Sequence, residues 1–406
     1  MNFFEFTVGT VGTVRALAQR ALKKAAARPF IDTDDPVRRT VSILHPPALD
    51  LVVSDVFEHG PDGRTFRLVP TGGKGDRLPP FRAGQYLSIK GTWGGACVSR
   101  PYSISSAPYE ALLATGGYYE ITVKRQSDGL VSPHIFSTWQ KATRVSASGP
   151  HGEFYHEPLR DAGDIVAIAG GSGITPFLSM AREIIHGDME ARLVILYGVR
   201  TMDEALFEKE LIRLAGVAPD RLRVCYVVSE PDGTEKCATG FIDEGLIKKE
   251  IGDISDKSFF VCGPQALYAF FNSEAQKLTI PRRRIRWEVS GPNRVIGAHP
   301  AFPKKATGRE YALVVYLDRG QKTVPARAEE PILVALERAG IAADSRCRSG
   351  QCGICRAELI SGEVFIDPEN DARRRVDKEY GFIHSCSTYP VGDCTIRIVS
   401  PEVLTG

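Results

Sequence analysis

Two hydrophobic rhythms follow one another along the chain, and each predicts a different kind of sheet. Between about residues 51 and 154, short segments of alternating apolar residues are separated by Gly- and Pro-rich turns, which is typical of a small antiparallel barrel. From Asp164 the pattern changes, because near-continuous apolar segments alternate with stretches of helical period, such as 203–215. Strands that alternate with helices predict a parallel sheet with helices on both faces.

A third region follows a break in the pattern. Residues 291–309 are rich in Gly, Pro and charge and indicate a linker. Beyond it, an apolar strand, 312–317, and a helical stretch, 329–340, begin a further compact domain. The sequence thus predicts a multidomain protein with these parts: a partly helical N-terminal extension, 1–45, a β-barrel domain, 46–160, an α/β domain, 161–290, a linker, 291–309, and an α+β domain, 310–406.

The extension has an apolar face over 14–25, with Arg and Lys elsewhere. This pattern favours a helix that packs on its own protein or frays in solvent, and a basic helix that contacts an acidic partner or a membrane surface is the alternative. No apolar run reaches the length of a bilayer span, so we expect no integral membrane segment. A formal net charge of +2 predicts no affinity for nucleic acid.

Nine cysteines are unevenly distributed, and four of them have a ligand-like spacing. Cys347, Cys352 and Cys355 form a C-x4-C-x2-C run, and Cys386 follows about thirty residues later. Thiolates are soft ligands that suit iron–sulfur clusters, and this spacing differs from the paired CxxC units of a zinc ribbon, which is the alternative. One tight cluster in a long chain also indicates a reducing compartment, so we expect a cytoplasmic protein.

The run RCRSGQCGIC with the later HSC resembles the 2Fe–2S loop of plant-type ferredoxins, in which Gly350 and Gly353 let the backbone curl around the cluster. The region upstream resembles the ferredoxin–NADP reductase superfamily. The domain order is similar to that of the reductases of phenylacetyl-CoA epoxidase, ketosteroid hydroxylase and phthalate dioxygenase. The resemblance covers the chain from about residue 51. It implies an antiparallel β-barrel flavin domain, an α/β parallel-sheet nicotinamide domain and an α+β β-grasp ferredoxin domain.

The sequence Arg100-Pro101-Tyr102-Ser103 matches the RxYS motif of that superfamily. By resemblance, Arg100 meets a flavin phosphate, Tyr102 the isoalloxazine ring and Ser103 a ring heteroatom. A glycine and a hydroxyl in a later GxxS element suit a pyrophosphate. The segments SISSAP and GPHGEF favour FAD over FMN. The residues expected to bind the flavin are Arg100, Pro101, Tyr102, Ser103, Thr122, Val123, Lys124, Gly129, Val131 and Ser132.

A glycine-rich turn, 170–176, follows a buried strand and opens a helix, which indicates dinucleotide phosphate binding. The resemblance places Thr175 and Cys262 where nicotinamide meets flavin, so these two and Ser103 are the expected catalytic residues. Arg200 would suit a 2′-phosphate, but acidic residues close in sequence favour NADH over NADPH. The residues expected to bind the nicotinamide cofactor are Gly171, Gly173, Thr175, Pro176, Tyr197, Arg200, Cys262, Gly263 and Pro264. Glu288 lies where relatives carry an acidic residue after the last strand of this domain, which is weak support for a role.

These features together predict an enzyme that takes hydride from a nicotinamide cofactor and passes single electrons through Cys347, Cys352, Cys355 and Cys386. The expected partner is a redox protein, foremost an oxygenase component. Two alternatives stay open: a different acceptor such as a corrinoid protein, or an electron-transfer subunit that another flavoprotein feeds. The acceptor itself has no motif in the sequence.

Overall fold

The computed structural model describes most of the chain from residue 48 onward. The described residues are 40–41, 44, 46, 48–72, 77–93, 95–114, 116–127, 129–233, 237–288, 291–293, 295–318, 320–368 and 371–398. The predicted extension, 1–45, therefore falls outside them, apart from three helical residues, Thr40, Val41 and Leu44. Within the described part, no helix is both long and apolar enough to cross a membrane.

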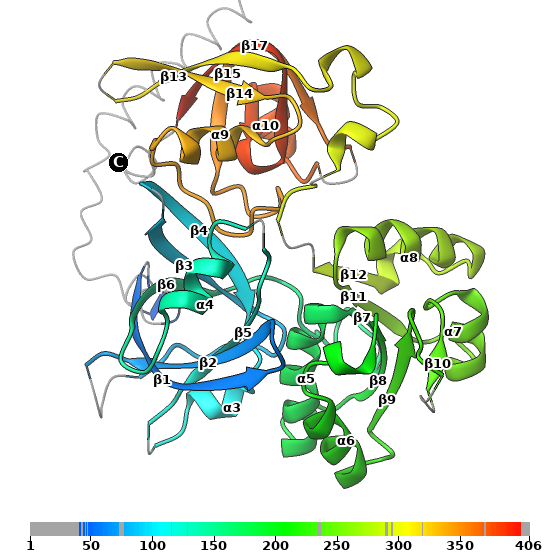
Figure 1. Cartoon of the computed structure of the whole chain (residues 1–406). Coiled ribbons are helices and arrows are strands. Elements are labelled where there is room, and N and C mark those ends of the chain that lie inside the picture. Colours follow the sequence, from blue (N-terminus) through cyan, green and yellow to red (C-terminus); the bar gives the residue numbers. More distant parts are fainter. Residues whose placement is uncertain are drawn as a thin grey trace, which may run out of the picture. The chain divides into compact units, whose positions relative to one another are not determined.

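The first domain is the antiparallel barrel that the alternating pattern predicts (blue to cyan in Figure 1). Its strand order is β4-β3-β6-β1-β2-β5. A bridge between Ile104 and Ile121 joins the end of β4 to β5 and closes the sheet. Two short helices, α3 (Pro108–Ala111) and α4 (Ser132–Thr138), lie between the strands. The strands are β1 (Leu49–His59), β2 (Gly63–Pro70), β3 (Tyr86–Trp93), β4 (Ala96–Ser103), β5 (Tyr119–Lys124) and β6 (Arg144–His151).

The second domain contains a parallel sheet with the order β10-β9-β8-β7-β11-β12. Alternate residues of β7 face opposite sides, because side chains of a strand have a period of two. Ile165 and Ala167 pack with α5 and α6, whereas Val166 and Ile168 pack with α7 and α8. Figure 1 shows these helices on the two faces of the sheet, as predicted. The strands are β7 (Asp164–Gly170), β8 (Arg192–Val199), β9 (Leu222–Val228), β10 (Ala238–Thr239), β11 (Ser258–Cys262) and β12 (Ile285–Glu288), and the helices are α5 (Thr175–His186), α6 (Glu208–Val217), α7 (Glu244–Ile251) and α8 (Gln265–Lys277).

The third domain is a mixed five-stranded sheet with the order β14-β13-β17-β15-β16 (yellow to red in Figure 1). Strand β17 pairs parallel with β13 and antiparallel with β15. Helix α9 (Ile332–Arg338) packs its apolar side on this sheet, which is the predicted β-grasp arrangement. The remaining elements are β13 (Glu310–Tyr316), β14 (Gln321–Arg327), β15 (Arg356–Ile366), α10 (Arg375–Glu379), β16 (Phe382–His384) and β17 (Thr388–Ile398).

The segment predicted as a linker, 291–309, is packed along part of its length. Ile296, Phe302 and Ala306 are buried, and they form a small apolar cluster with Tyr389 and Val391 of β17. The Tyr389 hydroxyl also donates a hydrogen bond of 2.8 Å to the carbonyl of Asn293. This packing holds the segment against the sheet of the third domain.

Candidate functional site

The four clustered cysteines converge from two segments: Cys347, Cys352 and Cys355 from the loop between α9 and β15, and Cys386 from the short turn between β16 and β17. The Sγ atoms of Cys355 and Cys386 lie 3.2 Å apart. The Cys352 and Cys386 side chains both contact the Cys347 sulfur and lower the pKa of that thiol. All four are free cysteines. Cys347, Cys355 and Cys386 are buried, and only Cys352 of the four is exposed.

Backbone N–H groups point at these sulfurs, which makes the loop fit a 2Fe–2S cluster. The Gly350 N–H donates to Cys386 Sγ at 3.2 Å, and the Cys352 N–H donates to Cys347 Sγ at 3.3 Å. Gly350 has a φ of +80° and Gly353 one of +71°, the left-handed conformation that glycine adopts readily. The donor set, four convergent thiols with amide support, is the one that iron–sulfur clusters require.

A buried ion pair supports the loop from α9. Arg348, directly after the first cysteine, is 3% exposed and has a φ of +58°. Its guanidinium binds the carboxylate of Glu337 in α9, with Nη1–Oε1 and Nη2–Oε2 distances of 2.5 and 3.0 Å. On the other side of the loop, the His384 ring contacts the Gly350 carbonyl at 2.5 Å. The cluster loop is thus held from two elements.

The RxYS motif lies at the end of β4, paired with β3. Ser103 is opposite Tyr86, and Arg100 is opposite Ile89. Arg100 Nη1 donates to the carbonyl of Ser99 at 2.8 Å. Tyr102 packs beside the barrel core, and burial raises the pKa of its phenol. A cation, a ring and a hydroxyl therefore share one strand end, and this set of donors fits a flavin with a phosphate.

The side chains predicted on β5 take separate directions. Thr122 is buried, and its hydroxyl contacts those of Thr65 at 2.7 Å and Ser105 at 3.3 Å. Val123 is in the barrel core. Lys124 binds Glu204 of the second domain at 3.1 Å. Any contact of Thr122 with a cofactor would therefore run through its backbone.

The predicted GxxS element forms a tight loop before α4. The Ser132 hydroxyl accepts a hydrogen bond of 3.0 Å from the Gln126 N–H. A Cβ on Gly129 would lie 3.3 Å from that hydroxyl, which is closer than ordinary contact. Val131 is buried and directly precedes the helix. The hydrogen bond between Gln126 and Ser132 thus holds the two ends of this loop together.

The glycine-rich turn after β7 lies directly against the end of β11. A Cβ on Gly173 would lie 2.1 Å from the Cys262 carbonyl oxygen, and one on Gly263 would lie 3.1 Å from the Gly170 nitrogen. Gly171 has a φ of +51°, and no atom lies within 4 Å of where its Cβ would be. The Thr175 hydroxyl donates to the Ser172 carbonyl at 3.0 Å, and Pro176 follows in the first turn of α5. The turn is a cradle of the kind that a dinucleotide pyrophosphate occupies.

Tyr197 and Arg200, at and beyond the end of β8, differ in their surroundings. Tyr197 is fully buried; its hydroxyl donates to the Gly171 carbonyl and accepts from the Leu206 N–H, both at 3.0 Å. Through its hydrogen bond to the Gly171 carbonyl, Tyr197 thus stabilises the glycine turn. The Arg200 guanidinium is exposed and binds Glu204, which also binds Lys124. These two cations lower the pKa of Glu204, although burial opposes them.

The three domains meet around four side chains. Burial and then the charge of Glu288 raise the pKa of the Cys262 thiol. Burial and then Cys347 raise the pKa of Glu288 to about 8. Burial, followed by Cys347 and Cys352, raises the pKa of Tyr86 in β3. The end of β11, the end of β12 and the cysteine loop therefore lie close enough to one another for their charges to interact.

Sequence reasoning missed part of this site. The sequence motifs give no role to Tyr86, and they support a role of Glu288 only weakly. Glu337 had no signal, because an acidic residue in an amphipathic helix is normally a solvated one. Only the pairing of β3 with β4 and the packing of α9 bring these residues to the site.

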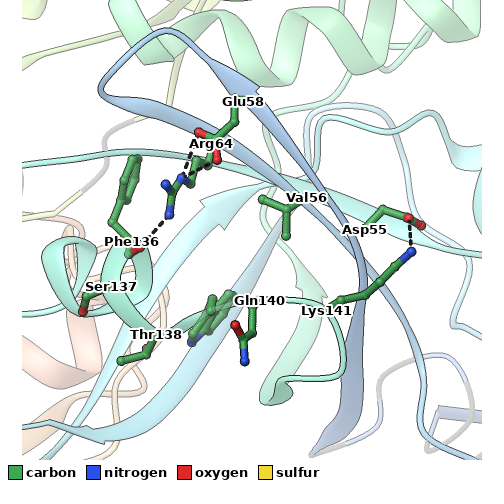
Figure 2. A pocket seen from close by; sticks show the side chains of 10 residues that line it. Asp55, Val56, Glu58, Arg64, Phe136, Ser137, Thr138, Gln140 and Lys141 are labelled. Atoms are coloured by element: carbon green, nitrogen blue, oxygen red, sulfur yellow. Dashed lines mark hydrogen bonds and ion pairs between the residues drawn. The ribbon is translucent and has the colours of Figure 1, made fainter.

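A surface groove lies elsewhere on the barrel, between β1, β2 and α4 (Figure 2). Its charges are paired with one another: Arg64 binds Glu58 at 2.9 Å, and Lys141 binds Asp55 at 3.0 Å. Arg64 Nη1 also donates to the Phe136 carbonyl at 2.5 Å. None of the predicted site residues lines this groove.

Three family models match consecutive parts of the chain. They are the oxidoreductase FAD-binding domain over residues 52–156, the oxidoreductase NAD-binding domain over residues 167–273 and the 2Fe-2S iron-sulfur cluster binding domain over residues 315–391. Their order follows the barrel, the parallel sheet and the β-grasp domain. The cofactors of the chain are therefore FAD, a nicotinamide dinucleotide and a 2Fe–2S cluster.

Relatives with the same organisation extend over most of the chain. The ferredoxin reductase component of 3-ketosteroid-9-alpha-monooxygenase from Mycobacterium tuberculosis is 28% identical over 355 residues, which is 85% of this chain and 94% of that protein. The reductase subunit of glycine betaine monooxygenase from Chromohalobacter salexigens is 25% identical over 327 residues, 78% of this chain and 87% of that protein. The structure of phthalate dioxygenase reductase aligns with a TM-score of 0.60 at 24% identity, covering 87% of this chain and 98% of that one, so the fold is the same. The chain thus combines an oxidoreductase FAD-binding domain, an oxidoreductase NAD-binding domain and a C-terminal 2Fe-2S domain, and it is an NAD(P)H-dependent flavin and iron–sulfur oxidoreductase, as its resemblance to the ferredoxin–NADP reductase superfamily predicts.

Proposed function

We propose that the chain is the reductase component of an oxygenase, which oxidises NADH and delivers single electrons to the oxygenase protein. The observation that carries this proposal is the proximity of three groups from three domains: Cys262 of β11, Tyr86 of β3 and Cys347 of the cysteine loop. Two relatives, named for a ketosteroid and a glycine betaine monooxygenase, support an oxygenase as the partner.

The nicotinamide site that we propose lies at the carboxyl ends of β7, β8 and β11. Gly171 leaves room for a pyrophosphate at the start of α5, where N–H groups and the helix dipole favour an anion, and Gly173 lets the turn pack against Cys262. Thr175 and Cys262 would line the nicotinamide end, with Gly263 and Pro264 beside them. Arg200 and Tyr197 would lie on the side of the site that takes the adenosine ribose. Glu204 holds Arg200, and this ion pair supports NADH over NADPH.

The flavin site that we propose lies along β4 and the loop before α4. Arg100 would hold a phosphate, the Tyr102 ring would pack on the isoalloxazine, and Ser103 would donate to a ring heteroatom. The loop of Gly129 and Ser132 would face the pyrophosphate of FAD. We also propose Pro101, Val131 and the backbone of Thr122, Val123 and Lys124 as parts of this lining, because the Thr122 and Val123 side chains are buried and Lys124 binds Glu204.

Bound flavin accepts two electrons with a hydride and releases them singly, and a 2Fe–2S cluster carries one electron at a time. The protein's own part is to position these groups and to keep water out. Glu288 is buried and pairs with Cys262 across β12 and β11, and burial raises the pKa of its carboxyl. Cys347, Cys352, Cys355 and Cys386 would hold the iron.

The domain limits that we propose are 46–160 for the flavin domain, 161–290 for the nicotinamide domain and 310–406 for the ferredoxin domain, joined by 291–309. We also propose a cytoplasmic location. Four thiols that serve as iron ligands require a reducing compartment during cluster assembly, which supports this assignment.

The test is to follow both cofactors of the purified protein during reduction by NADH. NADH should bleach the flavin absorbance, and a 2Fe–2S signal should then appear by electron paramagnetic resonance. The Cys352→Ser variant should lose the cluster signal and the reduction of cytochrome c, yet keep the bleaching of the flavin. Cys97→Ser, which replaces an exposed cysteine on β4, is the matched control and should behave as the wild type.

Two results would contradict the proposal. If the purified protein contains zinc in place of iron, the cluster assignment is wrong. If NADH leaves the flavin of the wild-type protein oxidised while a second flavoprotein reduces it, the chain is an electron-transfer subunit instead. The choice of an oxygenase as acceptor is tested separately, by adding candidate oxygenase proteins and measuring NADH-dependent product formation.

A further inference from the structure

A single buried carboxylate contacts both the cysteine loop and the flavin domain. Glu337 of α9 is 4% exposed. Its Oε1 lies 2.5 Å from Arg348 Nη1 in the cysteine loop and 3.7 Å from Arg100 Nη1 on β4. Arg100 is the residue that we propose for the flavin phosphate. The carboxylate therefore lies between the cation of one cofactor site and the loop of the other.

A second contact joins the same two elements. The Ser99 hydroxyl of β4 contacts the Ser345 carbonyl at 2.8 Å and the Ser345 hydroxyl at 2.7 Å. Both serines are buried, at 5% and 6% exposure. Ser345 is two residues before Cys347, and Ser99 directly precedes Arg100. We call these four residues, Ser99, Arg100, Glu337 and Ser345, the interdomain latch.

The chemistry of the latch favours one relative position of the two domains. A carboxylate taken out of water is destabilised unless it meets cations or donors of good geometry. Arg348 satisfies both oxygens of Glu337, and Arg100 adds a second positive charge on the side of the flavin domain. Moving the ferredoxin domain away from β4 would remove that second charge. It would also leave the Ser99 and Ser345 hydroxyls to find other partners.

We propose that Glu337 is a positioning residue, which fixes the cysteine loop against the flavin-binding strand and so sets the rate of electron transfer between the two cofactors. The inference rests on the proposed function, because it assumes a flavin at Arg100 and a cluster at Cys347. Electron transfer falls steeply with distance, so a small displacement of the loop slows it strongly. Reduction of the flavin by NADH takes place at the ends of β7 and β11 and does not involve Glu337.

The experiment uses the full chain with both cofactors and compares two steps in Glu337→Gln. Stopped-flow absorbance measures the reduction of the flavin by NADH, and freeze-quench paramagnetic resonance measures the later reduction of the cluster. We expect the first rate to be unchanged and the second to fall at least tenfold, with iron and FAD contents equal to those of the wild type. The matched control is Glu330→Gln, which removes a carboxylate that binds Arg338 of α9 and should leave both rates unchanged.

A second variant covers the case in which Glu337→Gln loses iron because Arg348 has no counter-ion. Ser99→Ala leaves the Glu337–Arg348 pair intact and removes only the hydroxyl that contacts Ser345. Its cluster reduction should slow about threefold, because Ser345 loses a buried hydrogen bond to β4. If Glu337→Gln keeps its iron and transfers electrons at the wild-type rate, the proposal is wrong. If it loses iron, a wild-type rate in Ser99→Ala is the outcome that rejects it.

Failure of the proposed function gives a different result. Photoreduction of the flavin by light and EDTA starts the second step without NADH, so the latch can be measured even if NADH is not the natural donor. Wild-type protein that responds to light but not to NADH would contradict the proposed donor alone. Equal rates in wild-type and latch variants after photoreduction would contradict the latch alone.

Discussion

At the scale of single residues, the site depends on positions where a side chain has no room. Gly173 is the sharpest case, because a Cβ there would meet the Cys262 carbonyl oxygen at 2.1 Å and its carbon at 2.4 Å. Both are backbone atoms of a buried strand, so neither can turn aside. The close approach brings the glycine turn and Cys262, two separate parts of the predicted nicotinamide site, into contact.

Gly173→Ala should therefore lower the free energy of unfolding by about 3 kcal/mol, as expected for an overpacked core. It should also raise the KM for NADH, because the turn moves away from β11. The matched control is Gly216→Ala in α6, where no atom lies within 4 Å of the Cβ position. Alanine there should stabilise the helix by up to about 1 kcal/mol. Urea unfolding measures the free energy of unfolding of the two variants. Equal changes in Gly173→Ala and Gly216→Ala would show that the contact with Cys262 is unimportant.

Glu204 gives a second residue-scale prediction, on the choice of nicotinamide cofactor. Its carboxylate binds Arg200 and Lys124, so neither cation is available to a 2′-phosphate. Glu204→Gln should release them and raise kcat/KM for NADPH about tenfold, since an arginine near the ribose accommodates that phosphate. The value for NADH should change little. Asp203→Asn, one position earlier and without a described ion pair to Arg200, is the control; an unchanged NADPH value in Glu204→Gln would contradict the assignment.

The sequence predicted which residue types lie at the site better than it predicted what their side chains do. The RxYS and glycine-turn motifs are continuous, and they lie at the ends of β4 and β7, as the strand pattern predicts. Thr122 and Tyr197 differ, because their hydroxyls bond within the protein: Thr122 to Thr65, and Tyr197 to the Gly171 carbonyl. Such partners come from neighbouring strands, and a single sequence contains no record of which residues face each other.

At the scale of elements, α5 is the link between the barrel and the parallel sheet. Arg182 of this helix binds Glu210 of α6 at 2.8 Å, Glu120 of β5 at 2.8 Å and Glu110 of α3 at 3.3 Å. Its side chain is only 14% exposed. Ser179, one turn earlier, donates to the Ser106 carbonyl at 2.6 Å. One helix thus carries several of the polar contacts that join the first two domains, beside the ion pair of Lys124 with Glu204.

Arg182→Ala should cost about 3–5 kcal/mol of unfolding free energy, because three carboxylates would lose a shared and largely buried cation. Arg192→Ala is the control, since Arg192 forms an exposed ion pair with Asp164 and should change stability little. Thermal unfolding of the two variants measures the difference. Similar melting temperatures would mean that Arg182 is not the link described here.

The predicted elements themselves were largely confirmed, because their signal is local. Both the barrel strands and the βα alternation follow from hydrophobic periodicity, which the chain carries in full. The segment 291–309 shows the limit of that reasoning. Its Gly and Pro content indicates a linker, yet Phe302 and Ile296 are buried against β17. Isolated apolar residues in a polar segment have no period, so their burial depends on a partner almost a hundred residues away.

At the scale of the whole molecule, the joint between barrel and parallel sheet should respond to pH through Glu183 of α5. Burial, reinforced by the charge of Asp188, raises the pKa of this carboxyl to about 7 from an ordinary value of 4.5. One of its oxygens, Oε2, is buried without a hydrogen-bond partner among the described residues. In the folded protein the carboxyl therefore keeps its proton to a higher pH than in the unfolded chain.

The direction of the pH effect follows from whether the folded protein or the unfolded chain binds this proton more tightly. Between pH 4.5 and about 7 the unfolded chain has released this proton and the folded protein has not, so rising pH favours unfolding. In Glu183→Gln this contribution should vanish. The melting temperature of the variant, relative to that of the wild type, should rise across this window and stay level above pH 7. Parallel profiles of the two proteins would contradict the assignment.

The domain order and the cofactors could be predicted for the whole molecule, because each domain has its own motif. The meeting of Cys262, Glu288, Tyr86 and Cys347 could not. It depends on how three separate cores dock, and the contacts that fix that docking, such as Ser99 with Ser345, join residues 246 positions apart. No periodicity or spacing encodes a contact of that range.

The strand order of the ferredoxin domain also bears on how the protein is made. Strand β17, the last strand of the described residues in chain order, lies in the middle of its sheet, between β13 and β15. The barrel and the parallel sheet are complete by residue 288, so both can fold while the rest is still being translated. The ferredoxin sheet cannot close until Thr388–Ile398 has emerged. Iron loading is therefore a late event, and a nascent chain stalled before β17 would already bind its nucleotides but hold no cluster.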